Sequence, residues 1–351
     1  MLNILQTLFN NSPAPKGQAI KPKKAHIHED INMPTVFDGQ GVQQKLAPLL
    51  AKGGEGMVYP LEQRPNILVK CYNEHVLSKD QKILKEKITA MCSLRSKFKS
   101  DTICWPAIMV YNQQKNWLGY AMTKFEGKTL RTLAHAIAYK KYTPHLNRQN
   151  IVSVLIDLLE NIQVLHEHKV MIGDYNLSNF MWHPQTFKVG FIDCDSYQIQ
   201  VDQRTFPCLV GSPDLTAPEH HGKAFKNIIR TPQSEYFSIA IILFMCLMLG
   251  RHPYDMIGGS DPVENLKSGK FAYGLGNTGI PKGQWYNIWS HMPYRLKSLF
   301  IQTFTEGVSN PQKRVDIKTW LDALKVYQRE LNKGYHDKDL IPAEPKKSKK
   351  S

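Results

Sequence analysis

The segment Ile172-Gly-Asp-Tyr-Asn-Leu-Ser-Asn179, with Phe191-Ile-Asp-Cys-Asp-Ser196 downstream, decides the fold that this sequence predicts. Asp174 and Asn179 lie in a loop between a predicted helix and a predicted strand. Asp174 could orient an attacking hydroxyl group and accept its proton, and the side-chain oxygen of Asn179 could bind a divalent cation. The alternative is an ordinary turn, because Asp, Asn and Ser favour turns through local hydrogen bonds.

The carboxylate of Asp193 comes at the end of an apolar strand, which is an unusual position for a purely structural role. Beside a phosphate site it would hold Mg²⁺, because this ion prefers one or two carboxylates together with phosphate oxygens. Asp193 is therefore a candidate metal ligand.

Glycines punctuate the run from Ala51 to Tyr59, and Lys70 lies on the next predicted strand. A glycine-rich turn lets backbone N–H groups approach phosphates closely, since no Cβ intervenes. The lysine could reach the same phosphates as a point charge. A flexible hairpin without a ligand is the alternative interpretation of this run.

Two charged residues of the second half are predicted to be buried. Glu219 ends the motif Thr216-Ala-Pro-Glu219, and Arg314 belongs to Asn310-Pro-Gln-Lys-Arg314. A buried charge needs a partner, so both residues are expected to have partners within the fold.

Composition excludes several classes of protein. The chain has 351 residues, 42% of them hydrophobic and 21% charged, which excludes a largely disordered, collagen-like or coiled-coil chain. The net charge of +15 would attract polyanions, but no nucleic-acid motif accompanies it, so no dedicated nucleic-acid binding is expected. The six cysteines lack metal-knuckle spacing and fit a reducing cytoplasm. The longest apolar run, Ile239–Leu249, is too short to span a bilayer, so we expect a cytoplasmic protein without a membrane partner.

Hydrophobic periodicity predicts a β-rich part followed by a helical part. The predicted strands cover residues 57–61, 67–72, 117–125, 180–182 and 188–192, and the predicted helices cover residues 78–99, 149–168, 235–249, 294–304 and 317–333. His166 and His168 end one of these helices, where we expect them to cap carbonyl groups. Residues 1–35 are predicted to be a flexible leader and residues 335–351 a basic disordered tail.

Taken together and in this order, the motifs resemble those of the eukaryotic-like protein kinase family, over about residues 45–330. The resemblance implies an α+β, bilobal protein-kinase-like fold, with a small β-rich N-lobe (36–127) and a larger helical C-lobe (128–334). It also implies an ATP-dependent kinase that transfers the γ-phosphate of ATP to Ser/Thr hydroxyls of a protein substrate, with Mg²⁺ or Mn²⁺ as the metal.

The same resemblance assigns roles to individual residues. Asp174 matches the catalytic aspartate, Lys70 the lysine that pairs with the phosphates, and Glu86 the helix glutamate that pairs with this lysine. Asn179 and Asp193 match the metal ligands, and Arg314 matches the ion-pair partner of Glu219. The residues that match the ATP-binding positions are Ala51, Gly53, Gly54, Glu55, Gly56, Val58, Lys70, Met122, Thr123, Phe125 and Met181.

Several positions depart from the family pattern. Gly173 replaces the arginine that normally reads a phosphate on the activation segment, which suggests activity without phosphorylation of that segment. Asn176 replaces the lysine or arginine that steadies the transferring phosphate, which puts the reaction rate in doubt. Glu235 occupies a position where the family usually has Asp.

Alternatives of other classes remain at this point. One is a nucleotide-binding pseudokinase or scaffold with little or no phosphotransfer, and another is a small-molecule phosphotransferase. The details of the loops look like an atypical bacterial branch of these kinases. Members of that branch are encoded beside a metal-dependent protein phosphatase and a von Willebrand A-type protein, which are therefore expected partners.

Overall fold

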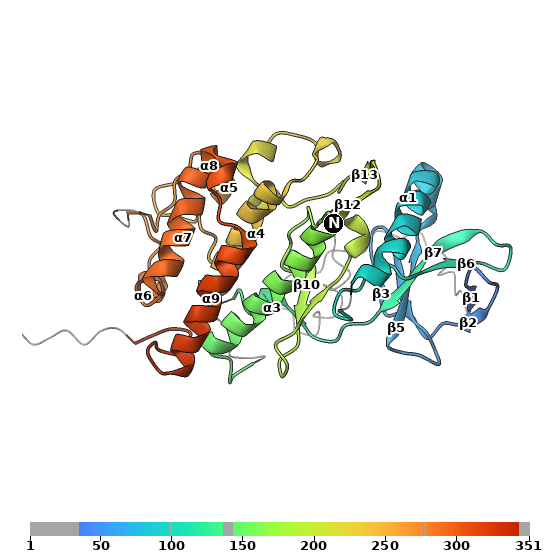
Figure 1. Ribbon diagram of the computed structural model, residues 1–351, viewed down its shortest axis with the longest axis horizontal. Helices are drawn as coiled ribbons and strands as arrows, with labels where there is room; N and C mark the ends of the chain where they lie inside the picture. The colour runs from blue at the N-terminus through green and yellow to red at the C-terminus, as the bar shows by residue number, and fades with distance from the viewer. Residues whose placement is uncertain (1–34, 99, 136–142, 275, 277, 344–351) are drawn as a thin grey trace, which may run out of the picture. The chain divides into compact units, whose positions relative to one another are not determined.

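The structure is a computed structural model that describes residues 35–98, 100–135, 143–274, 276 and 278–343 (Figure 1). The chain divides into two compact units. Unit 1 comprises Met1–Ser96 and Cys104–Lys124, and unit 2 comprises Lys97–Ile103 and Phe125–Ser351. The predicted leader lies, apart from Thr35, outside the described residues. The chain passes into unit 2 after Lys124, shortly before the boundary at Gly127 that the sequence suggested.

Unit 1 is built on an antiparallel sheet of seven strands in the order β2-β1-β6-β7-β5-β4-β3. The helix α1 (Glu74–Leu94) packs against β6 and β7. The strand β5 lies between β4 and β7, and five of its six residues are buried. The strands are β1 (Thr35–Phe37), β2 (Gln43–Lys45), β3 (Ala51–Lys52), β4 (Gly56–Pro60), β5 (Ile67–Tyr72), β6 (Ile108–Tyr111) and β7 (Trp117–Thr123).

The helix α1 begins earlier than the sequence predicts. Its backbone is non-helical at Asp80, where φ is −142° and ψ is 32°. The apolar residues at helical spacing, including the buried Ile88 and Met91, come only after this kink. The turns before the kink therefore carried no periodic signal. The helix also ends sooner, at Leu94, and a 3₁₀ turn (Arg95–Lys97) follows it.

Unit 2 combines helices with two small antiparallel sheets, ordered β11-β10-β8 and β13-β12-β9. The helix α3 packs between α4 and α9, and Figure 1 shows α3 in green beside α9 in red. The α-helices among the described residues of this unit are α3 (Arg148–Glu167), α4 (Pro232–Leu247), α5 (Pro262–Lys267), α6 (Trp285–Ser290), α7 (Tyr294–Phe304), α8 (Glu306–Ser309) and α9 (Ile317–Asn332). The strands are β8 (Lys128–Thr129), β9 (Val170–Met171), β10 (Phe180–Trp182), β11 (Val189–Phe191), β12 (Gln198–Val201) and β13 (Arg204–Phe206).

Capping residues set the start of the two central helices of unit 2. Asn147 and Asn150 form a capping box at α3, and Thr231 and Ser234 form one at α4. Each box satisfies N–H groups that the first helical turn leaves without partners. The box at Thr231 explains why α4 begins before the predicted residue 235. The predicted α+β class and the long helices of the second half are confirmed.

The C-terminal segment differs from the prediction of a disordered tail beginning at residue 335. The structure describes this segment as far as Ala343, and Leu340 within it is buried. The backbone carbonyls of Lys338 and Leu340 accept hydrogen bonds from Arg148, at 2.9 and 2.6 Å. The segment therefore packs on unit 2 because it supplies acceptors to a buried arginine.

Within the described part of the chain, no helix has both the length and the apolar character needed to cross a bilayer.

Candidate active site

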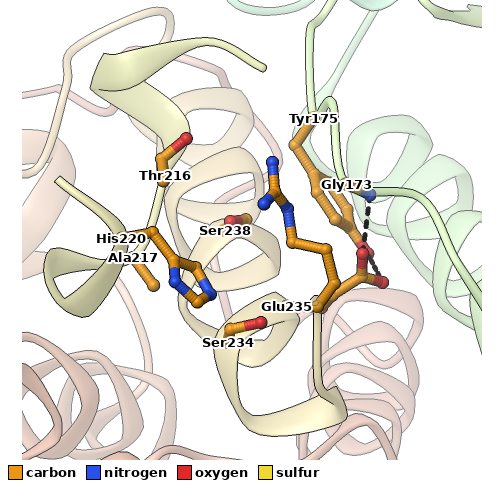
Figure 2. Close-up of a pocket in the computed structure, with 9 residues that line it drawn as sticks. Gly173, Tyr175, Thr216, Ala217, His220, Ser234, Glu235 and Ser238 are labelled. Carbon is orange, nitrogen blue, oxygen red and sulfur yellow. Dashed lines mark hydrogen bonds between the residues drawn. The ribbon is translucent and has the colours of Figure 1, made fainter. Parts of the chain in front are cut away.

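The loop that follows β9 is anchored by the buried carboxylate of Glu235, at the start of α4 (Figure 2). Its Oε1 accepts the backbone N–H of Gly173 at 2.7 Å, and its Oε2 accepts the hydroxyl of Tyr175 at 2.9 Å. His166 Nε2 lies 2.7 Å from the same Oε2 atom. The expectation that His166 caps carbonyls was therefore wrong, because its ring contacts the buried carboxylate of Glu235. Two hydrogen bonds from the loop and one contact from α3 thus meet at Glu235, and the two from the loop fix it on α4.

Asp174 lies in this loop with only 8% of its surface exposed. Its Oδ1 accepts a hydrogen bond from the Ser212 hydroxyl at 3.0 Å, and its Oδ2 accepts one from Asn179 Nδ2 at 3.3 Å. Burial raises the pKa of Asp174, and the hydrogen bonds and the nearby Arg230 only partly oppose this. The carboxylate is thus oriented and has the raised basicity that a general base needs.

The hairpin of β10 and β11 brings Asn179 and Asp193 together. Asn179 precedes β10, and its backbone carbonyl accepts the N–H of Ile192 at 3.0 Å, directly before Asp193. Asp193 has a left-handed backbone with φ of 55°, which is uncommon for a residue other than glycine and is often found at functional sites. Its carbonyl accepts the N–H and the hydroxyl of Ser196.

The side-chain oxygens of Asn179 and Asp193 suit a divalent cation that also binds oxygens of a ligand. Asn179 Nδ2 donates to Asp174, so the amide oxygen is the end of Asn179 that is available to a cation. A carboxylate and an amide oxygen suit Mg²⁺, which keeps waters and phosphate oxygens among its ligands. No group of three or more His, Cys, Asp or Glu residues that could bind a metal occurs in the described ranges.

In unit 1, the side chain of Asn73 holds the glycine-rich turn between β3 and β4. Its Nδ2 donates to the carbonyls of Gly53 at 3.3 Å and Gly54 at 3.0 Å, and its backbone N–H donates to Glu55 O at 2.8 Å. A Cβ at position 54 would meet nothing within 4 Å, whereas one at position 56 would lie 2.4 Å from Cys71 O. Gly56 is therefore required by the close approach of β5. No pattern in the sequence indicated this role of Asn73.

Lys70 lies on β5, opposite Val58 of β4, and is only 3% exposed. Its Nζ is 4.0 Å from Glu55 Oε2 and 5.5 Å from the centre of the Tyr72 ring. Glu86 is half-buried on α1. The pairing of Lys70 with Glu86 stays a prediction.

The remaining predicted nucleotide contacts belong to both units. In unit 1, Met122 and Thr123 end β7, and Met122 lies opposite Leu68 of β5. In unit 2, Met181 is the central residue of β10, and Phe125 packs against Gly190, where a Cβ would meet its ring at 2.2 Å. Unit 1 thus holds the glycine-rich turn and Lys70, and unit 2 holds Asp174, Asn179 and Asp193.

The predicted ion pair of Glu219 and Arg314 is confirmed. The guanidinium donates to both carboxylate oxygens at 2.7 Å, and it also donates to the carbonyls of Gly307 and Gln233. Burial acts to raise the pKa of Glu219, but the hydrogen bonds and charge of Arg314 prevail, so the pKa is lowered. Beside this pair, burial and the cations Arg230, Lys223 and Arg314 lower the pKa of His220 to about 4.

No family model matches this chain. Comparison with curated proteins does find relatives that are similar in sequence. The chain is similar to Protein kinase YegI of Escherichia coli strain K12, with 27% identity over 309 residues, covering 85% of this chain and 47% of the relative. The protein of the same name from Escherichia coli O157:H7 is 26% identical over 311 residues, covering 86% of this chain and 47% of the relative. The chain therefore spans about half the length of the curated relatives it matches.

Among solved structures, the chain resembles the autoinhibited serine kinase domain of the giant muscle protein titin. The TM-score is 0.61 at 15% identity, and the match covers 85% of this chain and 83% of that chain. This likeness confirms the predicted protein-kinase-like fold. The sequence relatives, both named protein kinases, support a protein-kinase-like family.

Proposed function

We propose that this chain is an ATP-dependent protein kinase that transfers the γ-phosphate of ATP to Ser/Thr hydroxyls of protein substrates. The observation that carries the proposal is the buried carboxylate of Asp174, which Ser212 and Asn179 orient within one loop. The hairpin that positions Asn179 and Asp193 supports it, as do the two relatives named protein kinases.

Asp174 would orient the substrate hydroxyl and accept its proton. Most of the catalysis in phosphoryl transfer comes from positioning and from stabilising charge. The two hydrogen bonds to Asp174 supply such positioning in advance. Asn179 and Asp193 would hold Mg²⁺ or Mn²⁺, which would neutralise charge on the phosphates of ATP.

Unit 1 would contribute the phosphate contacts. The backbone N–H groups of the turn Gly53–Gly56 and the ammonium of Lys70, oriented by Glu86, are suited to phosphate oxygens. The residues proposed to contact the rest of the nucleotide are Ala51, Val58, Met122, Thr123, Phe125 and Met181.

One observation favours a second candidate, a nucleotide-binding pseudokinase with little phosphotransfer. Asn176 Oδ1 accepts the backbone N–H of Ser178 at 2.9 Å. The side chain that replaces the expected lysine or arginine thus closes a local turn and brings no charge to a phosphate. Loss of such a cation would weaken the stabilisation of the transition state.

The test uses purified full chain with γ-labelled ATP and Mg²⁺ or Mn²⁺. Label is followed into the chain itself, into a generic basic protein and into small alcohols. Asp193→Asn and Asp174→Asn should each reduce transfer to protein by about 10²-fold or more, and Asp174→Asn should leave ATP binding intact. Asp202→Asn is the matched control, because Asp202 also has a left-handed backbone, with φ of 53°, in the turn between β12 and β13.

Unchanged transfer in both site variants would refute the proposal. ATP binding without transfer in the wild type would favour the pseudokinase. Transfer to small alcohols in place of protein would assign a small-molecule phosphotransferase. A cognate phosphatase and a von Willebrand A-type protein stay expected partners.

A further inference from the structure

Position 173, directly before Asp174, has no room for a side chain. Gly173 has a left-handed φ of 73°, and a Cβ there would lie 2.6 Å from Cys208 Cβ and 2.8 Å from its Sγ. A contact below 3 Å between such atoms requires a rearrangement. The segment of residues 207–212 therefore packs directly onto the catalytic loop, in the space where a side chain at position 173 would begin.

The guanidinium of Arg230 lies beside this same space. Its Nε is 3.5 Å from the place that a Cβ of residue 173 would take. Arg230 is only 5% exposed, and an arginine side chain keeps its charge in proteins. Its Nη2 donates to the backbone carbonyl of Val210 at 3.3 Å. A buried cation thus contacts the 207–212 segment next to the catalytic loop.

Arg230 is held firmly from two sides. Its backbone N–H donates to Gln198 Oε1 at 2.8 Å, and its carbonyl accepts from Gln198 Nε2 at 2.9 Å, which fixes it on β12. Its guanidinium lies 5.5 Å from the centre of the Phe225 ring. That ring packs on Gly211, where a Cβ would meet it at 2.7 Å. The arginine and the ring together hold the middle of the segment.

The burial of the Arg230 guanidinium lowers the stability of the fold. Its Nη1 is buried and has no hydrogen-bond partner among the residues that the structure describes. A buried donor left unsatisfied costs free energy, more so on a charged group. Residues that break such a rule tend to be found where function requires them.

The far end of the segment contacts the catalytic carboxylate itself. Ser212 donates to Asp174 Oδ1 at 3.0 Å. The segment is thus held at Cys208 by Gly173, at Val210 by Arg230 and at Ser212 by Asp174. Each of these three contacts is made by the backbone or side chains of the chain itself.

We infer that Arg230 is a positioning residue that supplies the cation missing at position 173. It holds the 207–212 segment against the catalytic loop, so that the site is assembled without phosphorylation of the segment. This inference rests on the proposed kinase function and adds a statement about its regulation.

The test compares Arg230→Met, which removes the charge at similar length, with Arg230→Lys, which keeps the charge without the planar fork. Arg204→Met is the matched control, because Arg204 also lies over a phenylalanine ring, that of Phe206, at 4.4 Å, but is itself exposed at the start of β13. Hydrogen exchange of residues 208–212, the Kd for ATP and the kcat for a basic protein are measured on each variant of the 351-residue chain.

In Arg230→Met we expect exchange of the segment to rise and kcat to fall by about 10- to 100-fold, while the Kd for ATP changes by less than about twofold. Arg230→Lys should lie between this variant and the wild type, and Arg204→Met should match the wild type. General destabilisation would instead raise exchange throughout unit 2. Treatment of the wild type with a phosphatase should leave kcat unchanged.

Two results would overturn the inference: wild-type exchange of the segment in Arg230→Met, or loss of wild-type activity after phosphatase treatment. Failure of the proposed function looks different. In that case the wild type transfers no phosphate, but its 207–212 segment still exchanges slowly and Arg230→Met speeds that exchange. This result would refute the proposed kinase and support Arg230 as the residue that holds the segment.

Discussion

Gly173 shows how much one residue position depends on its neighbours. Gly173 and Gly222 both have left-handed backbones, with φ of 73° and 77°. A Cβ at position 173 would collide with Cys208, whereas one at position 222 would meet nothing within 4 Å. Alanine substitutions at the two positions therefore separate the free-energy cost of the left-handed backbone from the cost of overpacking.

We predict that Gly173→Ala lowers the free energy of unfolding by about 2–4 kcal/mol, since about 1–2 kcal/mol of backbone strain adds to the cost of overpacking. Gly222→Ala should cost only the strain, about 1–2 kcal/mol. Urea unfolding measures both values. Equal losses in the two variants would show that the 207–212 segment does not pack against position 173 as described.

At the scale of elements, the turn between β3 and β4 depends on Asn73 in the residues before α1. The two carbonyls that its side chain binds belong to the turn proposed to contact phosphates. We predict that Asn73→Ala weakens ATP binding by about three- to tenfold, because the turn gains freedom that binding must then remove. Calorimetric titration with ATP measures the change.

Asn112→Ala is the matched control for this variant. Asn112 lies in the turn between β6 and β7 of the same unit, and its side chain accepts the backbone N–H of Asn116 at 2.8 Å. Asn112→Ala should lower the free energy of unfolding but leave the affinity for ATP unchanged. A similar loss of ATP affinity in both variants would mean that general loosening of unit 1 is the cause.

The ion pair of Glu219 and Arg314 ties the segment before α4 to the segment before α9, and it makes stability depend on pH. The pKa of Glu219 is lowered in the folded chain from its ordinary value of 4.5. The pair therefore contributes its full stability above pH 4.5 and loses it as the pH falls through the folded pKa. We predict that Glu219→Gln costs about 1–3 kcal/mol at pH 7.

This difference in unfolding free energy should shrink as the pH falls below 4.5, because the wild-type carboxyl then becomes protonated as well. Denaturation of both proteins between pH 7 and pH 3.5 provides the measurement. A difference that stays constant over this range would contradict a titrating ion pair.

The sequence predicted the elements with strong local patterns. The bounds of α7 match the prediction, and α9 ends one residue before it, because apolar residues recur there at helical spacing. The candidate site residues Asp174 and Asn179 could also be predicted from the sequence, since they belong to one short loop. The order of the motifs, rather than any single one, pointed to the fold.

The supporting residues could not be predicted, because their roles arise from contacts far along the chain. Arg230 binds Val210 and Gln198, and Glu235 binds His166. The short strands β12 and β13 carry too few residues for a periodic signal. Neither propensity nor spacing reveals a partner that only tertiary packing supplies.

At the scale of the whole molecule, the last described residues complete the core of unit 2. The guanidinium of Arg148, only 3% exposed, donates to the carbonyls of Leu340 at 2.6 Å and Leu247 at 3.2 Å. Asn287 donates from its side chain to the carbonyl of Pro342. Residues 335–343 therefore satisfy buried polar groups on two helices, α3 and α6.

We predict that removal of residues 335–351 lowers the free energy of unfolding by about 3–5 kcal/mol. The buried guanidinium of Arg148 loses the carbonyl of Leu340, although it keeps that of Leu247, and the buried side chain of Leu340 is removed. Removal of residues 344–351 alone is the matched control and should change it by less than about 0.5 kcal/mol, since every contact named above is kept. Urea unfolding of both shortened chains provides the comparison. If Arg148→Met restores stability to the chain that ends at Gly334, the loss comes from the unpaired charge; no gain would instead assign it to the lost apolar contacts of Leu340.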